Sequence, residues 1–163
     1  MKVIFLDIDG VLATQRTRFD CFDGQCVSHL NKILEVTDAR IVISSTWRIG
    51  HTTEELIEIC KVGHDFDPGD KRPARVEDQN NRLIANAIVG RTIQLNEYMC
   101  RGREIDDWLK DAEAQGIPVE SFVILDDDSD MEPHMGKLVK TDCYTGMSSE
   151  HAQEAIKLLN KLN

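Results

Sequence analysis

Two aspartates, Asp7 and Asp9, stand two residues apart directly after a run of four apolar residues, Val3 to Leu6. The run is short, continuous and rich in β-branched and aromatic residues, which predicts a strand buried on both faces. Such a strand would carry Asp7 to the carboxyl edge of a sheet, where open α/β folds bind their ligands. Two carboxylates about 5 Å apart repel one another by about 3 kcal/mol at an effective dielectric of ~20. A divalent cation would offset that repulsion, so the pattern predicts a metal site.

Two later strand candidates also end in polar residues. The first, Arg40 to Ser45, ends in hydroxyls, and the second, Ser121 to Leu125, runs into Asp126 and Asp127. Because parallel strands end at the same edge of a sheet, we expect these side chains to converge with the aspartates near the N-terminus. The basic run Arg101-Gly102-Arg103 precedes the last of these strands and could aim a cation at the same edge. Carboxylates suit a Mg²⁺ ion, whereas hydroxyls and a cation suit a phosphate.

The elements that must position these residues alternate along the whole chain. Helical spacing of apolar residues predicts helices ending near Thr37, beginning at Thr53, and covering Glu77 to Val89, Glu104 to Gln115 and Ser148 to Leu162. Two further short strands are expected at Arg91 to Leu95 and at Lys137 to Thr141. This alternation predicts an α/β fold: a three-layer, Rossmann-like parallel sheet of about five strands with helices on both faces.

Composition describes an ordinary globular protein of 163 residues, most economically a single domain. The net charge of −10 disfavours passive adsorption to nucleic acid or to an anionic membrane. No apolar run approaches the ~18 residues that a membrane span needs, and the N-terminal apolar run is too short for a signal peptide. The five cysteines are scattered and odd in number, which favours free, reduced thiols. We therefore expect a cytoplasmic protein.

At three places the sequence resembles the haloacid dehalogenase-like (HAD) phosphohydrolases. The string Asp7-Ile8-Asp9-Gly10-Val11-Leu12 resembles their first motif, Ile41-Val42-Ile43-Ser44 their second, and Val123-Ile124-Leu125-Asp126-Asp127 their fourth. Their third motif is a Lys or Arg, for which Arg101 is our first candidate and Arg103 our second. Fuller strings such as Ser-Ser-Thr-Trp-Arg, from Ser44, resemble the HAD domain of Swiss Army knife RNA-repair proteins. The resemblance covers essentially the whole chain, as a single HAD-like catalytic domain of residues 1–163.

The resemblance implies a Mg²⁺-dependent phosphatase that acts through an aspartyl-phosphate intermediate. Asp7 would be the nucleophile. Asp9 would protonate the leaving oxygen and then activate water. Mg²⁺ would lie between the Asp7 carboxylate, the Asp9 backbone carbonyl and one or both of Asp126 and Asp127.

The same resemblance gives roles to hydroxyl and basic side chains. Ser44 would donate hydrogen bonds to the phosphoryl oxygens, and Arg101 would neutralise charge on the bound group. Ser45, Arg48 and Arg103 are candidate substrate-binding residues. From the residues alone, either serine could bind phosphate or cap the next turn, and Ser44 is favoured for phosphate because it directly follows the apolar run. Arg48 could equally contact substrate phosphate or pair with a surface acid.

Many HAD enzymes carry a cap domain over the site, and this chain has no segment typical of a sheet-bearing cap. We therefore predict no large cap domain and an open site for a phosphorylated substrate, which could be a nucleotide or a nucleic-acid end. The basic run from Lys71 to Arg75 is typical of an exposed loop that could also contact a nucleic-acid backbone. The alternative is a non-catalytic, Mg²⁺- and phosphate-responsive module of the receiver type. Such a module needs a phospho-accepting Asp at the end of its middle strand, where this chain has Ser44 and Ser45.

Overall fold

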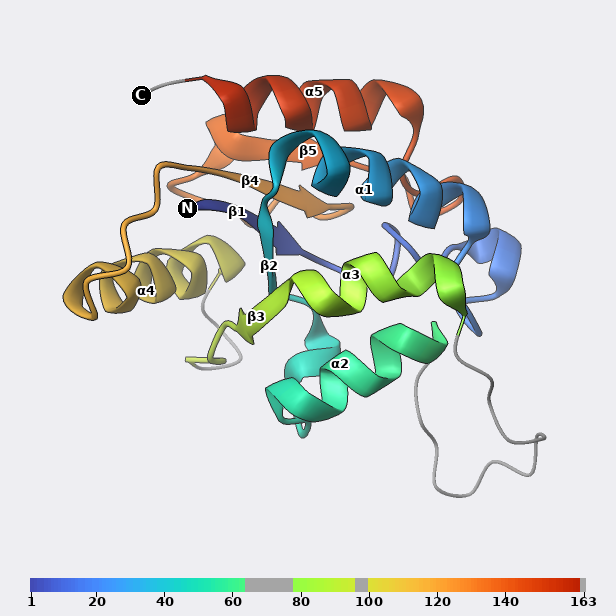
Figure 1. The fold of residues 1–163 in the computed structure, drawn as a ribbon, viewed down its shortest axis with the longest axis horizontal. Coiled ribbons are helices and arrows are strands. Elements are labelled where there is room, and N and C mark those ends of the chain that lie inside the picture. Colours follow the sequence, from blue (N-terminus) through green and yellow to red (C-terminus); the bar gives the residue numbers. More distant parts are fainter. Residues whose placement is uncertain (64–77, 96–99, 162–163) are drawn as a thin grey trace.

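The computed structural model describes residues 1–63, 78–95 and 100–161. They contain a five-stranded parallel sheet in the order β3-β2-β1-β4-β5, with β1 at its centre (Figure 1). The strands are β1 (Lys2–Leu6), β2 (Arg40–Ile43), β3 (Ile88–Arg91), β4 (Ser121–Asp126) and β5 (Leu138–Lys140). The helices are α1 (Gly24–Thr37), α2 (Thr53–Val62), α3 (Arg82–Ala87), α4 (Arg101–Ala114) and α5 (Ser149–Asn160).

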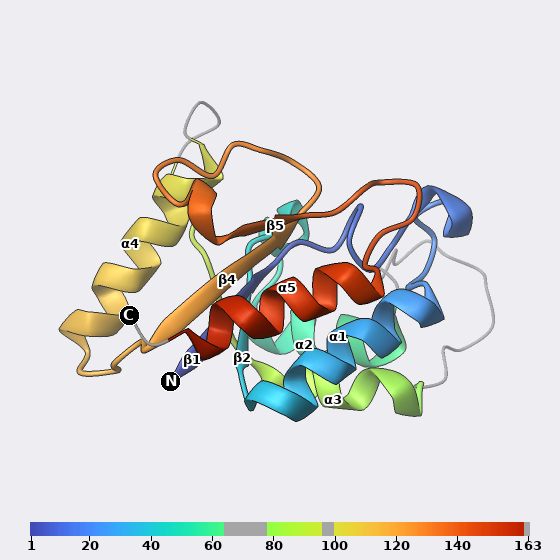
Figure 2. The same cartoon turned by 90° about the horizontal axis from the view of Figure 1, so that it is seen from above.

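Helices cover both faces of the sheet, so the predicted three-layer architecture is confirmed. Helices α1, α2, α3 and α5 pack on one face around a core that includes Leu6, Ile43 and Leu125. Of the described helices, α4 is the one that packs on the other face, against Phe5, Val42 and Ile124; Figure 2 shows this arrangement from above. Alternate residues of each strand supply the two cores, as the pleat of a sheet requires. Nothing in the described residues forms a sheet-bearing cap over the carboxyl edge.

The third strand is where the sequence prediction was wrong. The strand is Ile88–Arg91, whereas we expected helix as far as Val89 and a strand from Arg91 to Leu95. Helix α3 stops at Ala87 because Ile88 is buried and pairs with Ile41 of β2, and this pairing outweighs the local helical pattern. The chain therefore enters the sheet three residues earlier than expected.

Other features agree with the expectations where the structure describes them. All five cysteines are free. Among the described helices, none is both long and apolar enough to cross a membrane. The basic run from Lys71 to Arg75 lies outside the described residues.

Candidate active site

A row of polar side chains crosses the sheet at its carboxyl edge. Leu6 of β1 is in register with Ile43 of β2 and with Leu125 of β4, so the next residues, Asp7, Ser44 and Asp126, lie side by side. Backbone hydrogen bonds extend the ladder by that residue: Asp7 N–H donates to Leu125 O at 2.9 Å, and Ser44 N–H donates to Leu6 O at 2.9 Å. By the alternation of the pleat, all three side chains point to the face that α4 covers. The predicted convergence is therefore present in the fold.

Arg101, the first residue of α4, reaches this row. Its Nη1 lies 2.5 Å from Asp126 Oδ2 and 3.2 Å from Asp7 Oδ2. Burial by itself lowers the pKa of Arg101, but the charges of Asp126, Asp7 and Asp130 outweigh it and raise that pKa, so the guanidinium stays charged. Arg103 lies further along the helix, where it is exposed to solvent. Of the two basic candidates, the structure places Arg101 at the acids.

Three carboxylates gather beside Arg101. Oxygens of Asp7, Asp126 and Asp127 all lie within 4.8 Å of one another. Burial, followed by the charge of Asp7, raises the pKa of Asp126 to about 7, although Arg101 opposes this shift. Burial and Asp7 also raise the pKa of Asp127. One arginine cannot neutralise three carboxylates, so the group has the oxygen ligands and the surplus negative charge that a divalent cation needs.

The absence of a side chain at Gly10 provides the space that the Asp127 carboxylate occupies. Its φ is +74°, and a Cβ built on it would lie 2.3 Å from Cγ of Asp127. A side chain at position 10 would therefore both strain the backbone and collide with the third carboxylate. The hydroxyl of Thr141 donates to the Gly10 carbonyl at 2.7 Å and holds the turn against the end of β5.

The loop after β4 fixes the start of α4 and thus the place of Arg101. Asp130 accepts hydrogen bonds from the first two amides of the helix: its Oδ2 from Arg101 N–H and its backbone carbonyl from Gly102 N–H, each at 3.1 Å. A Cβ on Gly102 would lie 2.3 Å from the carbonyl oxygen of Glu132, so only glycine allows the helix to approach this closely. These contacts explain why α4 begins at Arg101 and not at Glu104 as predicted.

The two serines after β2 differ in what their hydroxyls do. Ser45 Oγ accepts a hydrogen bond from Trp47 N–H at 3.4 Å and so caps the following turn. Ser44 Oγ is buried and has no hydrogen-bond partner among the described residues. Thr92 lies next in the row, because its N–H donates to Ile43 O at 3.0 Å. Its hydroxyl is also buried and has no hydrogen-bond partner among the described residues. Sequence reasoning missed Thr92 because the register of β3 was predicted wrongly.

The second aspartate, Asp9, has a partner that the sequence did not reveal. Trp47 Nε1–H donates to Asp9 Oδ2 at 2.9 Å. The Asp9 carboxylate is not one of the three that gather beside Arg101. Trp47 also packs against the larger core, and its indole nitrogen in addition orients a predicted catalytic side chain. No spacing in the sequence signals this contact, which joins residues 38 positions apart.

Arg48 does not pair with a surface acid. Its side chain is 4% exposed, and its guanidinium forms a buried ion pair with Glu104 of α4. Its Nη1 also donates to the carbonyls of Ser44, at 2.6 Å, and Ser45, at 2.7 Å. Arg48 therefore ties the residues after β2 to the first turn of α4. Burial lowers the pKa of Arg48, and Glu104 partly offsets this.

The sheet is Rossmann-like, with acids at the ends of its first and fourth strands, a serine after its second strand and a basic residue at the start of α4. This is the arrangement of a HAD-like phosphohydrolase domain. A family model described as the HAD domain in Swiss Army Knife RNA repair proteins matches residues 3–152. The chain therefore belongs to that family, and with it to the hydrolase and phosphatase superfamily. Comparisons with curated proteins and with solved structures give no match.

Proposed function

We propose that this domain is a Mg²⁺-dependent phosphomonoesterase that acts through an aspartyl-phosphate on Asp7. The observation that carries the proposal is the juxtaposition of three carboxylates with the Arg101 guanidinium at the carboxyl edge of the sheet. The surplus negative charge suits a divalent cation, and Arg101 suits the phosphoryl group that would face it.

The reaction would proceed in two displacements. In the first, an Asp7 carboxylate oxygen attacks phosphorus, the bond from phosphorus to the ester oxygen breaks, and the Asp9 carboxylic acid gives its proton to the departing oxygen. In the second, the Asp9 carboxylate takes a proton from water, the water oxygen attacks phosphorus, and the bond to Asp7 breaks to release inorganic phosphate. The hydrogen bond from Trp47 would hold Asp9 in one orientation through both steps.

Asp7, Asp126 and Asp127 are the residues that would hold Mg²⁺, because carboxylate oxygens are hard ligands and those of the three residues lie within 4.8 Å of one another. The ion would supply charge neutralisation that lets a phosphate dianion approach the Asp7 carboxylate. Ser44, whose buried hydroxyl has no described partner, would donate to a phosphoryl oxygen, and Arg101 would balance the developing charge. A phosphate would thereby satisfy a donor that the described residues leave unpaired.

For the substrate, we propose a phosphorylated nucleic-acid end or a nucleotide. The name of the matching family, which refers to RNA repair, supports this class. The net charge of −10 opposes long contacts along a nucleic-acid backbone, so recognition limited to the terminal phosphate fits the chain better. Arg101 is the cation that a bound terminal phosphate would meet.

The test is turnover of para-nitrophenyl phosphate with Mg²⁺ by the unmodified protein and by the Asp7→Asn variant. We expect the variant to lose activity by about a thousandfold or more, because an amide cannot replace the nucleophile. Asp38→Asn is the matched control. Asp38 is exposed and precedes β2, at the end of the strand opposite to the carboxylate cluster. Its backbone is in the left-handed region, at φ 51°, which Asn tolerates. Equal turnover by the Asp7→Asn variant and the unmodified protein would reject the mechanism.

Two further measurements divide the proposal into parts. With para-nitrophenyl phosphate, whose leaving group departs without a proton, the Asp9→Asn variant should accumulate a hydroxylamine-sensitive phosphate on Asp7, because the second displacement lacks its base. If the unmodified protein itself holds that phosphate for many minutes, the domain is a receiver-like switch and not a phosphatase. A panel of 3′- and 5′-phosphorylated oligonucleotides, nucleotides and sugar phosphates then identifies the substrate, and higher kcat/KM on sugar phosphates would contradict the nucleic-acid proposal.

A further inference from the structure

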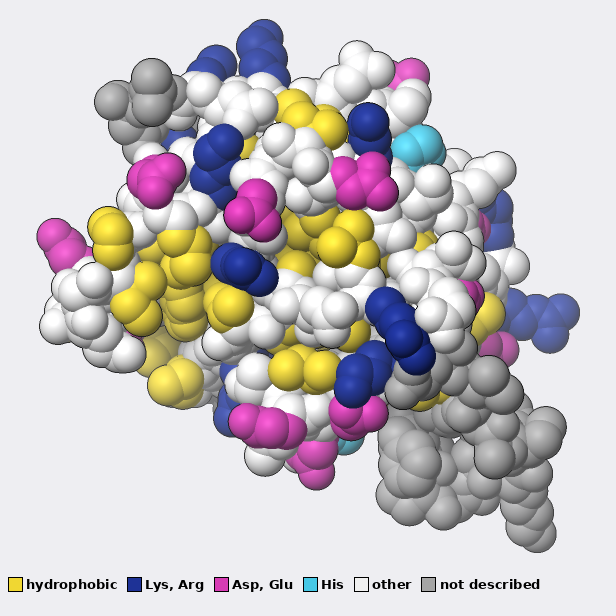
Figure 3. All heavy atoms as spheres, in the orientation of Figure 1, with side chains coloured by type: hydrophobic (Ala, Val, Ile, Leu, Met, Phe, Trp, Pro, Cys, Tyr) yellow, Lys and Arg dark blue, Asp and Glu magenta, His cyan; other side chains and the backbone are white. Residues whose placement is uncertain are grey.

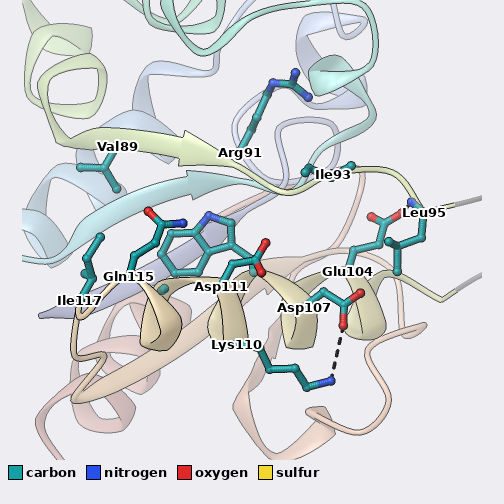
Figure 4. A pocket seen from close by; sticks show the side chains of 12 residues that line it. Val89, Arg91, Ile93, Leu95, Glu104, Asp107, Lys110, Asp111, Gln115 and Ile117 are labelled. Atoms are coloured by element: carbon teal, nitrogen blue, oxygen red, sulfur yellow. Dashed lines mark hydrogen bonds and ion pairs between the residues drawn. The ribbon is translucent and has the colours of Figure 1, made fainter.

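A groove of about 620 Å³ runs between the edge strand β3 and helix α4, apart from the carboxylate cluster (Figure 4). Val89 and Ile117 lie at one end, and Leu95 and Glu104 lie at the other. On the helix side the groove extends from Glu104 to Gln115, which at 1.5 Å per residue is about 17 Å. That length accommodates about five residues of an extended chain. We call this feature the β3–α4 groove.

The β3–α4 groove concentrates exposed apolar surface. Four of the large hydrophobic residues exposed in the described structure line it: Ile93 (66% exposed), Val89 (48%), Leu95 (40%) and Ile117 (40%). Figure 3 shows hydrophobic side chains gathered over α4 and β3. Single exposed apolar residues are ordinary on a protein surface, but a group of four along one groove indicates a binding surface.

The backbone of β3 faces this groove with one open edge. β3 is the last strand of the sheet on its side and pairs only with β2 among the described strands. Thr92 N–H points inward to Ile43 O, so by the alternation of a strand the backbone groups of Arg91 and Ile93 point to the open edge. Gly90 leaves the strand without a side chain here, and a Cβ on it would lie 3.7 Å from Trp108 Nε1, an ordinary van der Waals contact. An incoming strand would meet the edge donors and acceptors beside an apolar floor.

The charge along the groove selects the occupant. Three acids (Glu104, Asp107 and Asp111) and two cations (Arg91 and Lys110) line the groove, which leaves one acid in excess. Lys110 is shared between Asp106 and Asp107, and Glu104 is paired with Arg48. The described structure gives the Asp111 carboxylate no hydrogen bond or ion pair. The whole chain carries a charge of −10, so a second copy of it would be repelled from this surface.

We propose that the β3–α4 groove binds an extended peptide segment that adds a strand to β3 and alternates apolar residues with Lys or Arg. The apolar residues would rest on Val89, Ile93 and Ile117. The basic residues would point from the other face of the added strand, where the net charge of −10 on the chain attracts them. Backbone hydrogen bonds to the open edge supply affinity in such strand addition, and the pockets for alternate side chains supply specificity. This site is separate from the proposed phosphatase chemistry and does not depend on it.

The probe is the blocked heptapeptide Lys-Val-Lys-Ile-Lys-Val-Lys, titrated into the ¹⁵N-labelled protein. We expect amide shifts confined to Val89 through Leu95 and α4. Ile93→Ser should raise Kd about tenfold, because it removes the most exposed apolar contact. Val36→Ser is the matched control, because Val36 is 47% exposed on α1, and it should change Kd less than about twofold.

Two altered peptides test strand pairing and charge. Proline in place of the central Ile removes the amide hydrogen that a paired strand needs, and we expect it to abolish binding. Replacing every Lys by Glu should weaken binding about tenfold or more. Binding of either altered peptide as tightly as the first, or no shifts in β3, would overturn the proposal. A concentration-dependent dimer lost in Ile93→Ser, measured by sedimentation without peptide, would also overturn it by assigning the groove to a second copy.

Discussion

Two arginine–carboxylate groups lie one helical turn apart at the start of α4, and they differ in their balance of charge. In the first, Glu104 of the helix meets Arg48 from the turn after β2, one charge against one. In the second, Arg101 of the helix meets Asp126 and Asp7, with Asp127 in the same cluster. The first group is neutral, and the second carries two surplus negative charges if all its members are ionised.

The difference in balance matches a difference in how the polar atoms are used. Arg48 also donates to two backbone carbonyls, and Glu104 also accepts from Leu95 N–H at 3.2 Å, so this pair joins three segments of the chain. In the Arg101 group three carboxylates share one guanidinium, and the nearby Ser44 hydroxyl has no hydrogen-bond partner among the described residues. We infer that the neutral pair holds the edge of the sheet and the helix together, whereas the unbalanced group is left for a cation and a phosphate. Three substitutions test this comparison.

The largest expected effect is on stability and comes from the neutral pair. Glu104→Gln leaves the Arg48 guanidinium buried without a counter-charge, which typically costs about 3–5 kcal/mol. We expect the free energy of unfolding, measured by urea denaturation, to fall by that amount. The double variant Arg48→Met with Glu104→Leu removes both charges and should recover most of the loss. A Glu104→Gln variant as stable as the unmodified protein would show that the pair does not hold the fold.

The second largest expected effect is a loss of stability when Mg²⁺ is removed. Mg²⁺ at about 100 times its Kd should add about 2.7 kcal/mol to the free energy of unfolding by mass action, and EDTA should remove it. Asp126→Asn should lose this dependence on Mg²⁺, because it deletes a central ligand of the unbalanced group. Glu113→Gln, on the exposed side of α4, is the control that should keep it. If Mg²⁺ shifts the unfolding of neither the unmodified protein nor the control, the acids do not form a metal site.

The arrangement of the fold could be predicted because its sheet is made of strongly apolar runs separated by helical spacing. The exception is β3, where Ile88 and Val89 fit a helix or a strand equally well. Only the pairing of Ile88 with Ile41, a contact between distant parts of the chain, decides between the two. Local pattern carries no information on such a contact, so the strand was placed too late in the sequence.

Within the site, the predictable contacts are those that depend on the ends of strands. Asp7, Ser44 and Asp126 meet because parallel strands share an edge, and Arg101 meets them because α4 begins at that edge. The contacts of Trp47 with Asp9 and of Arg48 with Glu104 depend on how a turn folds over the sheet and on side-chain direction. No pattern in the sequence signals either contact, so the sequence alone does not decide between the two alternatives for Arg48.

The smallest expected effect on stability is that of Asp127→Asn. It should raise the free energy of unfolding, whereas Glu104→Gln should lower it, although both substitutions replace an acid by its amide. Burial and the charge of Asp7 raise the pKa of the Asp127 carboxyl, which means that its ionised form is disfavoured in the folded protein. In EDTA, Asp127→Asn should therefore raise the free energy of unfolding by about 1 kcal/mol, because it removes the repulsion between the Asp127 and Asp7 carboxylates. The gain is small because Asp127 is partly exposed to solvent, which weakens that repulsion. The exposed neighbour Asp128 gives the control, because Asp128→Asn should change stability by less than about 0.5 kcal/mol. Loss of stability in Asp127→Asn would mean that the three carboxylates are already balanced within the protein. The contrast with the Arg48–Glu104 pair would then disappear.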